Sequence, residues 1–147
     1  MTFDKAFGLG VALFSGRSNN DADFERYCET VMILDDLAKN TAKPAFILVI
    51  DRENPSPDAG WRKRMTQARD NLKSTPMVAF VCDSALLRGA IKAAEWISPR
   101  PFPFVVVEKF DEAVAWVETQ RPGTRGLFTT LYTELRSGAS RSPREIG

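Results

Sequence analysis

The chain has 147 residues, of which 44% are hydrophobic, and this is enough for one domain with its own apolar core. Its 20 basic and 19 acidic residues leave a net charge of +1, so no global field attracts nucleic acid or an anionic membrane. Histidine is absent, which excludes Ser-His and Cys-His catalysis. With neither a cationic leader nor a run long enough to span a membrane, we expect a cytoplasmic protein without a transmembrane segment or cofactor.

The first half of the chain alternates apolar runs with helical periodicity. Residues 10–16 form an apolar run bounded by glycines, which predicts a strand, and residues 3–7 supply a candidate antiparallel partner. Apolar side chains from Phe24 to Leu37 recur at helical spacing, which predicts an amphipathic helix of about 18 residues. The almost uninterrupted apolar run 45–51 then predicts a central strand covered on both faces.

The second half continues the alternation. Ser56 as N-cap and Pro57 in the first turn predict a second helix, and strands are expected over 77–82 and 104–107. Asp111 is the expected cap of the last core helix. Between these strands a third helix is expected to bury Leu87, Ala90, Ile91, Ala94 and Ile97. Strands joined by helices of this length predict an α/β fold with a largely parallel sheet of four to five strands and right-handed crossovers.

The composition changes after Val117, and we expect residues 1–120 to form the α/β domain and 121–147 a C-terminal extension. Within the extension a helical stripe predicts a short amphipathic helix over 127–136, followed by a mobile tail. The stripe could dock on the body of the domain, on a second copy or on a partner, and we favour the body. Its members are Leu127, Phe128, Leu131 and Leu135.

One concentrated basic surface is visible. Arg62, Arg69 and Lys73 lie on one face of the predicted second helix. Several cations so close together suit phospholipid headgroups, an acidic protein or RNA, although a solvated helix face explains them more simply. No aromatic residue is interleaved with these charges, which argues against nucleic acid as a partner.

The ends of the predicted strands carry little chemistry. Asp51 lies where open α/β sheets place their active sites, but no second carboxylate or histidine accompanies it, and loop capping is the simpler interpretation. No glycine-rich phosphate loop is present. Ser56 is a candidate for phosphorylation at a helix N-terminus, where simple capping again suffices as an explanation.

The order of elements resembles the STAS superfamily, and in particular its bacterial anti-sigma-antagonist-like branch related to lipid-binding CRAL-TRIO domains. The resemblance covers roughly residues 7–120 and is carried by the segments 14–16, 21–24, 47–51 and 110–117. It implies a small non-enzymatic module that binds proteins, lipids or other small ligands and relays a signal. Anti-sigma antagonists carry a phosphorylated serine in the turn after the central strand, and Ser56 is only an approximate positional match for it.

Four hypotheses of function follow from these features. The preferred one is a non-enzymatic regulatory or adaptor module that binds a protein partner through the basic face or the C-terminal stripe. The alternative is a small-molecule or lipid carrier with a pocket near Trp61, Trp96 and Phe102, and a phosphoswitch at Ser56 is weaker. An enzyme that uses Asp51 or Glu53 is also weaker, and a homo-oligomer is compatible with all of them.

Overall fold

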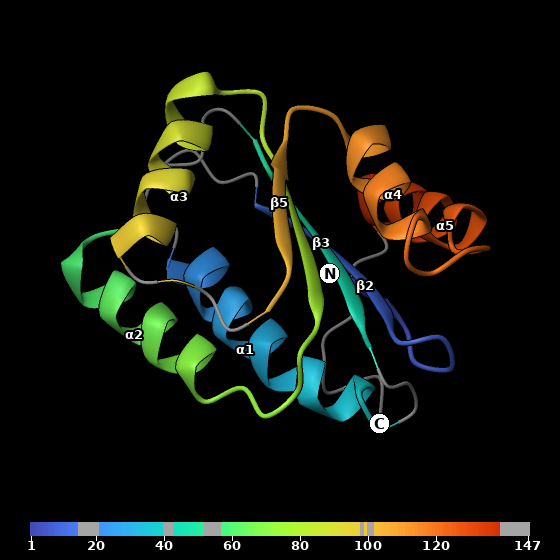
Figure 1. Cartoon of the computed structure of the whole chain (residues 1–147), viewed down its shortest axis with the longest axis horizontal. Coiled ribbons are helices and arrows are strands. Elements are labelled where there is room, and N and C mark those ends of the chain that lie inside the picture. Colours follow the sequence, from blue (N-terminus) through green and yellow to red (C-terminus); the bar gives the residue numbers. More distant parts are fainter. Residues whose placement is uncertain (15–20, 40–42, 52–56, 98, 100–101, 139–147) are drawn as a thin grey trace.

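The computed structural model describes residues 1–14, 21–39, 43–51, 57–97, 99 and 102–138, and these residues build a five-stranded sheet with helices on both faces (Figure 1). The strands lie side by side in chain order. The first pair is antiparallel and the other three pairs are parallel, which confirms the predicted α/β class with a largely parallel sheet. The strands are β1 (Thr2–Asp4), β2 (Leu9–Phe14), β3 (Ala45–Ile50), β4 (Met77–Val81) and β5 (Phe104–Val107).

The order of the strands decides which face each helix covers. Every new parallel strand is added on the same side of the previous one, so the right-handed crossover helices all fall on one face. Figure 1 shows these three helices together on that face, with two further helices on the other. The crossover helices are α1 (Asp21–Leu37), α2 (Ala59–Asp70) and α3 (Ala85–Ile97), and the opposite face carries α4 (Phe110–Glu118) and α5 (Arg125–Arg136).

Two cores lie on the two faces of the sheet, because successive side chains of a strand point in opposite directions. On β3, Ile47 and Val49 belong to the core under α4 and α5, whereas Phe46 and Leu48 belong to the core under α1. The strand is buried on both faces, and its continuous apolar run predicted this.

Gly10 permits a close approach between two aromatic rings. The rings of Phe3 and Phe46, on the strands flanking β2, pack over this residue with their centroids 5.9 Å apart. A Cβ at Gly10 would lie 2.5 Å from Cε2 of Phe46 and 2.8 Å from Cδ1 of Phe3. Only a residue without a side chain therefore fits beneath this pair.

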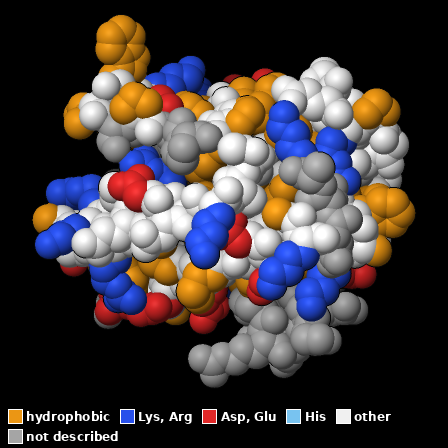
Figure 2. Space-filling view, turned by 60° about the horizontal axis from the view of Figure 1, so that its bottom comes forward, with side chains coloured by type: hydrophobic (Ala, Val, Ile, Leu, Met, Phe, Trp, Pro, Cys, Tyr) orange, Lys and Arg blue, Asp and Glu red, His pale blue; other side chains and the backbone are white. Residues whose placement is uncertain are grey.

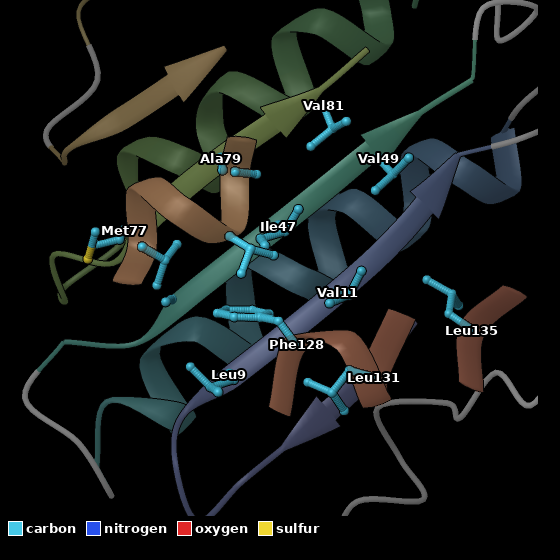
Figure 3. Close-up of a cluster of buried hydrophobic side chains, with 14 residues drawn as sticks. Leu9, Val11, Ile47, Val49, Met77, Ala79, Val81, Phe128, Leu131 and Leu135 are labelled. Atoms are coloured by element: carbon cyan, nitrogen blue, oxygen red, sulfur yellow. The ribbon is translucent and has the colours of Figure 1, made fainter. Parts of the chain in front are cut away.

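The C-terminal helix is part of the core. Phe128 of α5 is fully buried, and Figure 3 shows it with Leu131 and Leu135 facing the sheet near Leu9 and Val11. The Thr2 hydroxyl donates a hydrogen bond of 2.9 Å to the Leu131 carbonyl. The helix begins two residues earlier than predicted, and it shares one core with the sheet.

A carboxylate holds the start of α5. Glu118 accepts hydrogen bonds from the N–H groups of Gly123 (2.9 Å), Thr124 (3.1 Å) and Arg125 (3.0 Å). These bonds, first of all the one from Gly123, lower the pKa of Glu118 below its usual value of 4.5. The turn between α4 and α5 is thereby fastened at the end of α4.

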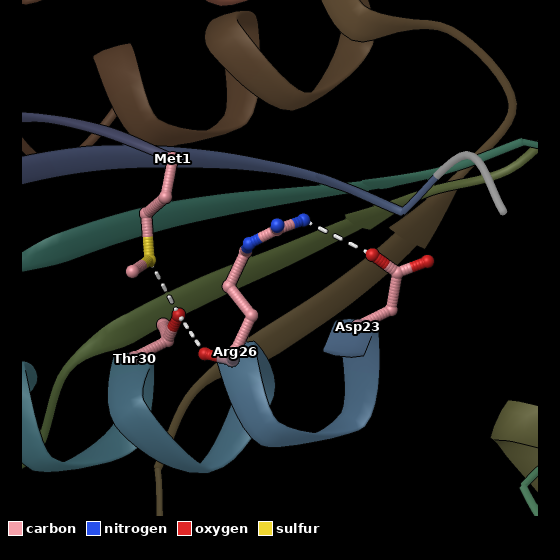
Figure 4. A network of polar contacts seen from close by, with 4 residues as sticks. All are labelled: Met1, Asp23, Arg26 and Thr30. Atoms are coloured by element: carbon pink, nitrogen blue, oxygen red, sulfur yellow. Dashed lines mark hydrogen bonds and ion pairs between the residues drawn. The ribbon is translucent and has the colours of Figure 1, made fainter. Parts of the chain in front are cut away.

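The start of the chain is tied to α1. The Met1 side chain is buried, and the Thr30 hydroxyl lies 2.8 Å from both the Met1 sulfur and the Arg26 carbonyl oxygen (Figure 4). One turn earlier, Arg26 pairs with Asp23 at 3.0 Å. Together with the bond from Thr2 to α5, these contacts connect the first residues to helices on both faces of the sheet.

Two helix starts differ from the predicted ones. Helix α2 is capped by Asp58, whose carboxylate accepts the Trp61 N–H at 2.9 Å, and Ser56 lies outside the described residues. At α4 the carboxylate of Glu112, and not that of Asp111, accepts the Lys109 N–H at 3.2 Å. Each difference moves the N-cap by two residues, from Ser56 to Asp58 and from Asp111 to Lys109.

Candidate functional site

Helix α3 exposes an apolar face. Leu86, Trp96 and Ile97 are 86%, 91% and 86% exposed, which is more than any other large hydrophobic side chain in the described part of the chain. None of the thirteen residues of α3 is buried. The predicted burial of Ala90, Ala94 and Ile97 is therefore wrong, and Leu87 and Ile91 are only half-buried. The exposed face, called the α3 face below, consists of Leu86, Gly89, Ala90, Ala93, Trp96 and Ile97.

The sequence of α3 explains this exposure. Its inner side is apolar, with Leu87 and Ile91 half-buried, and the α3 face is apolar as well. Arg88 lies between the two sides and donates a hydrogen bond of 2.9 Å to the Cys82 carbonyl at the end of β4. A helix that is apolar on most of its surface is ordinarily buried. In this chain half of that apolar surface has no cover within the described residues.

The strand next to α3 is the unpaired edge of the sheet. Helix α3 packs against β5, and the side chains of β5 are all half-buried. The four residues of β5 are Phe-Val-Val-Val, with no charged residue before Glu108. Edge strands usually carry charges, prolines or bulges that prevent further pairing. The β5 edge lacks these features within the strand, whereas β1 at the opposite edge includes Asp4.

The predicted basic face is not a single surface. Arg62 is exposed, but Arg69 is only 7% exposed and pairs with Asp70 at 3.0 Å. Lys73 lies beyond the end of α2, and its N–H donates to Asp35. In the space-filling view, Lys and Arg side chains form several separate groups, with acidic and hydrophobic side chains between them (Figure 2). The prediction of one exposed basic face is wrong because Arg69 is buried and because α2 ends at Asp70, before Lys73.

Arg62 and Arg69 instead line a groove between α2 and α3. The groove has a volume of about 350 Å³, and Leu87 and Ile91 of α3 form part of its wall. Most of the other lining residues are apolar or aromatic: Tyr27, Pro57, Met65, Ala90 and Ala94. An apolar groove with two guanidinium groups suits an amphipathic anion.

The three aromatic residues that were expected to mark a ligand pocket do not converge. Trp61 packs against Phe24 with a centroid distance of 5.5 Å and donates from Nε1 to Asp21 at 2.7 Å. Trp96 points into solvent, and Phe102 is buried in the core beneath α1. The prediction of a pocket near these three residues is therefore wrong.

A second pocket lies at the carboxyl ends of β3, β4 and β5, where open α/β sheets place their sites. It has a volume of about 430 Å³ and is lined by the carboxylates of Asp51, Asp83 and Glu108. Helix α5 contributes Arg136, which pairs with Asp51 at 3.4 Å and donates from Nε to the Tyr132 hydroxyl at 2.9 Å. Sequence reasoning identified Asp51 but missed the residues that α5 brings to it.

The chemistry of this strand-end pocket is limited. Asp51 is already engaged by a guanidinium, so proton abstraction by its carboxylate would compete with that ion pair. Burial raises the pKa of the Cys82 thiol, which keeps this residue in its unreactive form. In the described part of the chain, no group of three or more His, Cys, Asp or Glu residues is placed to hold a metal ion. Glu53 lies outside the described residues.

The apolar stripe of α5 is not an exposed surface. Phe128, Leu131 and Leu135 are buried against the sheet, and Leu127 is half-buried beside them. Docking on the body of the domain, the favoured alternative, is confirmed. Phe128, Leu131 and Leu135 are therefore corrected from partner-binding residues to core residues, because a partner could reach them only if α5 left the sheet.

Comparisons with known proteins identify no relative: no family model, no curated protein and no solved structure matches the chain. The resemblance to the STAS superfamily therefore stays a prediction. Among the helices described, none is both long and apolar enough to cross a membrane.

Proposed function

We propose that this chain is a non-enzymatic, protein-binding module of regulatory or adaptor type, and that its partner covers the α3 face. The observation that carries the proposal is the near-complete exposure of Leu86, Trp96 and Ile97 on one helix. Burial of each such side chain contributes about 1.5 to 3 kcal/mol. Tryptophan is also enriched among the residues that dominate binding energy at interfaces.

The position of the charges supports a binding role over catalysis. Asp51 is held by Arg136, the Cys82 thiol has a raised pKa, and the chain has no histidine. The six residues of the α3 face, by contrast, carry no charge, and Lys92 borders the face beside Gly89 and Trp96. The α3 face is thus an apolar surface whose burial requires little desolvation of charge.

A site-specific crosslinking experiment tests this function. A photoreactive phenylalanine analogue is placed at Ala93 on α3 and, as the matched control, at Ala115, an exposed alanine on α4 on the other face of the sheet. In the native cells we expect a protein adduct from position 93 and none from position 115. The adduct should disappear when Trp96→Glu is added. Equal adducts at both positions, or an adduct that Trp96→Glu leaves unchanged, would contradict the proposal.

A second candidate function is the carriage of a small amphipathic anion in the α2–α3 groove. The groove volume of about 350 Å³ lies in the range of small-molecule sites, and Arg69 is a buried cation in its wall. Native mass spectrometry of protein purified from its own cells tests this idea. We expect a retained small-molecule mass that Met65→Trp removes by filling the groove, while Met32→Trp at an exposed position on α1 keeps it. The wild-type protein without any bound mass would refute the carrier.

Phosphorylation of Ser56 is a separate hypothesis that the resemblance implies. Its test is phosphopeptide mapping of the native protein, in which an unmodified Ser56 under all growth conditions would remove the phosphoswitch.

A further inference from the structure

We infer that the partner of the α3 face is an amphipathic helix of another protein, with an apolar stripe of about three turns and acidic residues beside that stripe. The inference rests on the proposed function, because both use the α3 face, and it adds the chemistry of the partner. It is carried by the shape of the α3 face, by the continuation of this face into the α2–α3 groove, and by the charges at its two borders.

The α3 face has the length and the relief of a surface that binds a helix. Leu86 and Ile97 lie eleven positions apart on α3, which corresponds to about 16 Å or about three helical turns. Gly89 and Ala93 form a row of small residues at i and i+4, and the ridges of a second helix pack into low rows of this kind. A Cβ added at Gly89 would meet nothing within 4 Å, so the space above the row is open. The row therefore accepts large side chains from a helix that packs on α3.

The α2–α3 groove extends this apolar surface toward α2. Ala90 belongs to the α3 face and also lines the groove, which has a volume of about 350 Å³. Figure 1 shows α2 and α3 on the same face of the sheet, and Met65 and Thr66 line the groove from α2. A helix that packs on α3 is therefore able to place one of its apolar side chains in the groove, as in the recognition of amphipathic helices by hydrophobic grooves.

Basic residues border this surface on both sides. Lys92 is exposed and lies four positions before Trp96, so it stands beside the α3 face. On the α2 side, Arg62 is exposed and lines the groove. Within the described ranges of the chain, neither Lys92 nor Arg62 forms an ion pair with a carboxylate. Both cations are thus available to carboxylates of a partner, and charges at the rim of an interface contribute to its specificity and its rate of association.

The acidic side chains of α2 and α3 do not offset these two cations. Asp70, the acidic residue of α2, is engaged by Arg69 at 3.0 Å. Glu95, the acidic residue of α3, lies two positions after Ala93, and residues two apart on a helix point to nearly opposite sides. A partner helix with basic flanks would be repelled at both borders, and a second copy of α3 would bring its own Lys92 to the contact. An acidic amphipathic helix is the complementary partner.

The segment that crosslinks to α3 tests this inference. A photoreactive phenylalanine analogue at Leu86 replaces one large exposed side chain with another and leaves the row of Gly89 and Ala93 free. Peptide mass spectrometry of the adduct from native cells identifies the attached segment. We expect apolar residues at helical spacing and a net negative charge in that segment. Attachment to a basic segment, to one without helical periodicity, or to a second copy of this chain would overturn the inference.

Charge reversal at the border provides the second measurement. The attached segment is made as a synthetic peptide, and isothermal titration calorimetry gives its dissociation constant for the full chain. Lys92→Glu should raise this constant by about 5-fold or more, because attraction becomes repulsion, and the ratio should shrink in about 0.5 M NaCl. The matched control is Arg125→Glu, at an exposed arginine of α5 on the other face of the sheet, and it should change the constant by less than about 2-fold.

The outcomes separate this inference from the proposed function. A Lys92→Glu variant that binds the peptide as tightly as wild type, or no more weakly than Arg125→Glu does, would overturn the inference. If position 86 or position 93 crosslinks to a protein segment of another chemistry, the inference fails and the proposed function stands. If both positions crosslink only to lipid or to nothing, both fail.

Discussion

The substitution Phe128→Ala tests whether α5 is an integral part of the fold. Phe128 is fully buried in the core between α5 and the sheet. A phenylalanine buries about 150 to 250 Å² of surface, which corresponds to about 4 to 6 kcal/mol at 25 cal/mol per Å². Measured losses for buried Phe→Ala changes are about 3 to 5 kcal/mol. We therefore expect the free energy of unfolding to fall by about 4 kcal/mol.

The assay is urea unfolding followed by circular dichroism and by tryptophan fluorescence. With a typical slope of about 2 kcal/mol per molar urea, the midpoint should fall by about 2 M at an unchanged slope. The neighbouring change Thr129→Ala is the matched control, because Thr129 is exposed and its hydroxyl bonds only to Arg125 of the same helix among the contacts described. This control should move the free energy of unfolding by less than about 0.5 kcal/mol.

A small effect of Phe128→Ala would refute this reasoning. A loss below about 1 kcal/mol would mean that α5 is an appended segment, which the sheet does not need. Truncation after residue 121 gives the same test by another route, since the truncated chain should lose cooperative unfolding. A truncated chain with an unchanged urea midpoint would contradict the shared core.

Three further predictions concern single contacts. Gly10→Ala should cost about 1 to 3 kcal/mol, because the new methyl group would lie 2.5 Å from the Phe46 ring; a urea midpoint equal to that of wild type would count against this packing. Glu118→Gln should lower the melting temperature at pH 7. The pKa of Glu118 in the folded state lies below 4.5, so its ionised carboxylate stabilises the fold fully above pH 4.5 and loses this effect as the pH falls through the folded-state pKa. If the variant still melts at a lower temperature than wild type at pH 2, the ionised carboxylate is not the cause. Asp35→Asn should also lower the melting temperature at pH 7. Burial opposes the shift, but hydrogen bonds from Ser74 and Lys73 hold the pKa of Asp35 below 3.8. The variant should therefore be less stable than wild type at neutral pH and equally stable once the pH falls below the folded-state pKa. Equal stability of the two proteins at neutral pH would contradict this prediction.

Local patterns along the chain were sufficient to predict the class of fold. Each strand that contributes to the parallel sheet is an apolar run between polar turns, and the helices between them have a 3.6-residue period. These signals depend on neighbours in sequence, and the order of elements then restricts the topology through the right-handed crossover. The α/β class and the mostly parallel sheet could thus be obtained without coordinates.

The candidate sites depended on contacts between distant residues. The stripe from Leu127 to Leu135 has the same period whether it binds a partner or the sheet, and only the position of α5 shows that it is core. Lys73 shares a helix face with Arg62 and Arg69 only if α2 continues beyond Asp70, which it does not. Similarly, Arg136 reaches Asp51 although 85 residues separate them.

The amino-acid order by itself determined which segments are strands or helices and which of their sides are apolar, because periodicity is a local property. Tertiary structure alone decided which apolar sides are covered, because each helix has several such surfaces and the sheet has room for only some of them. Helix α3 makes the distinction plain: its sequence is as apolar as that of a core helix, yet Trp96 and Leu86 remain in solvent, since α3 lies at the edge of the sheet.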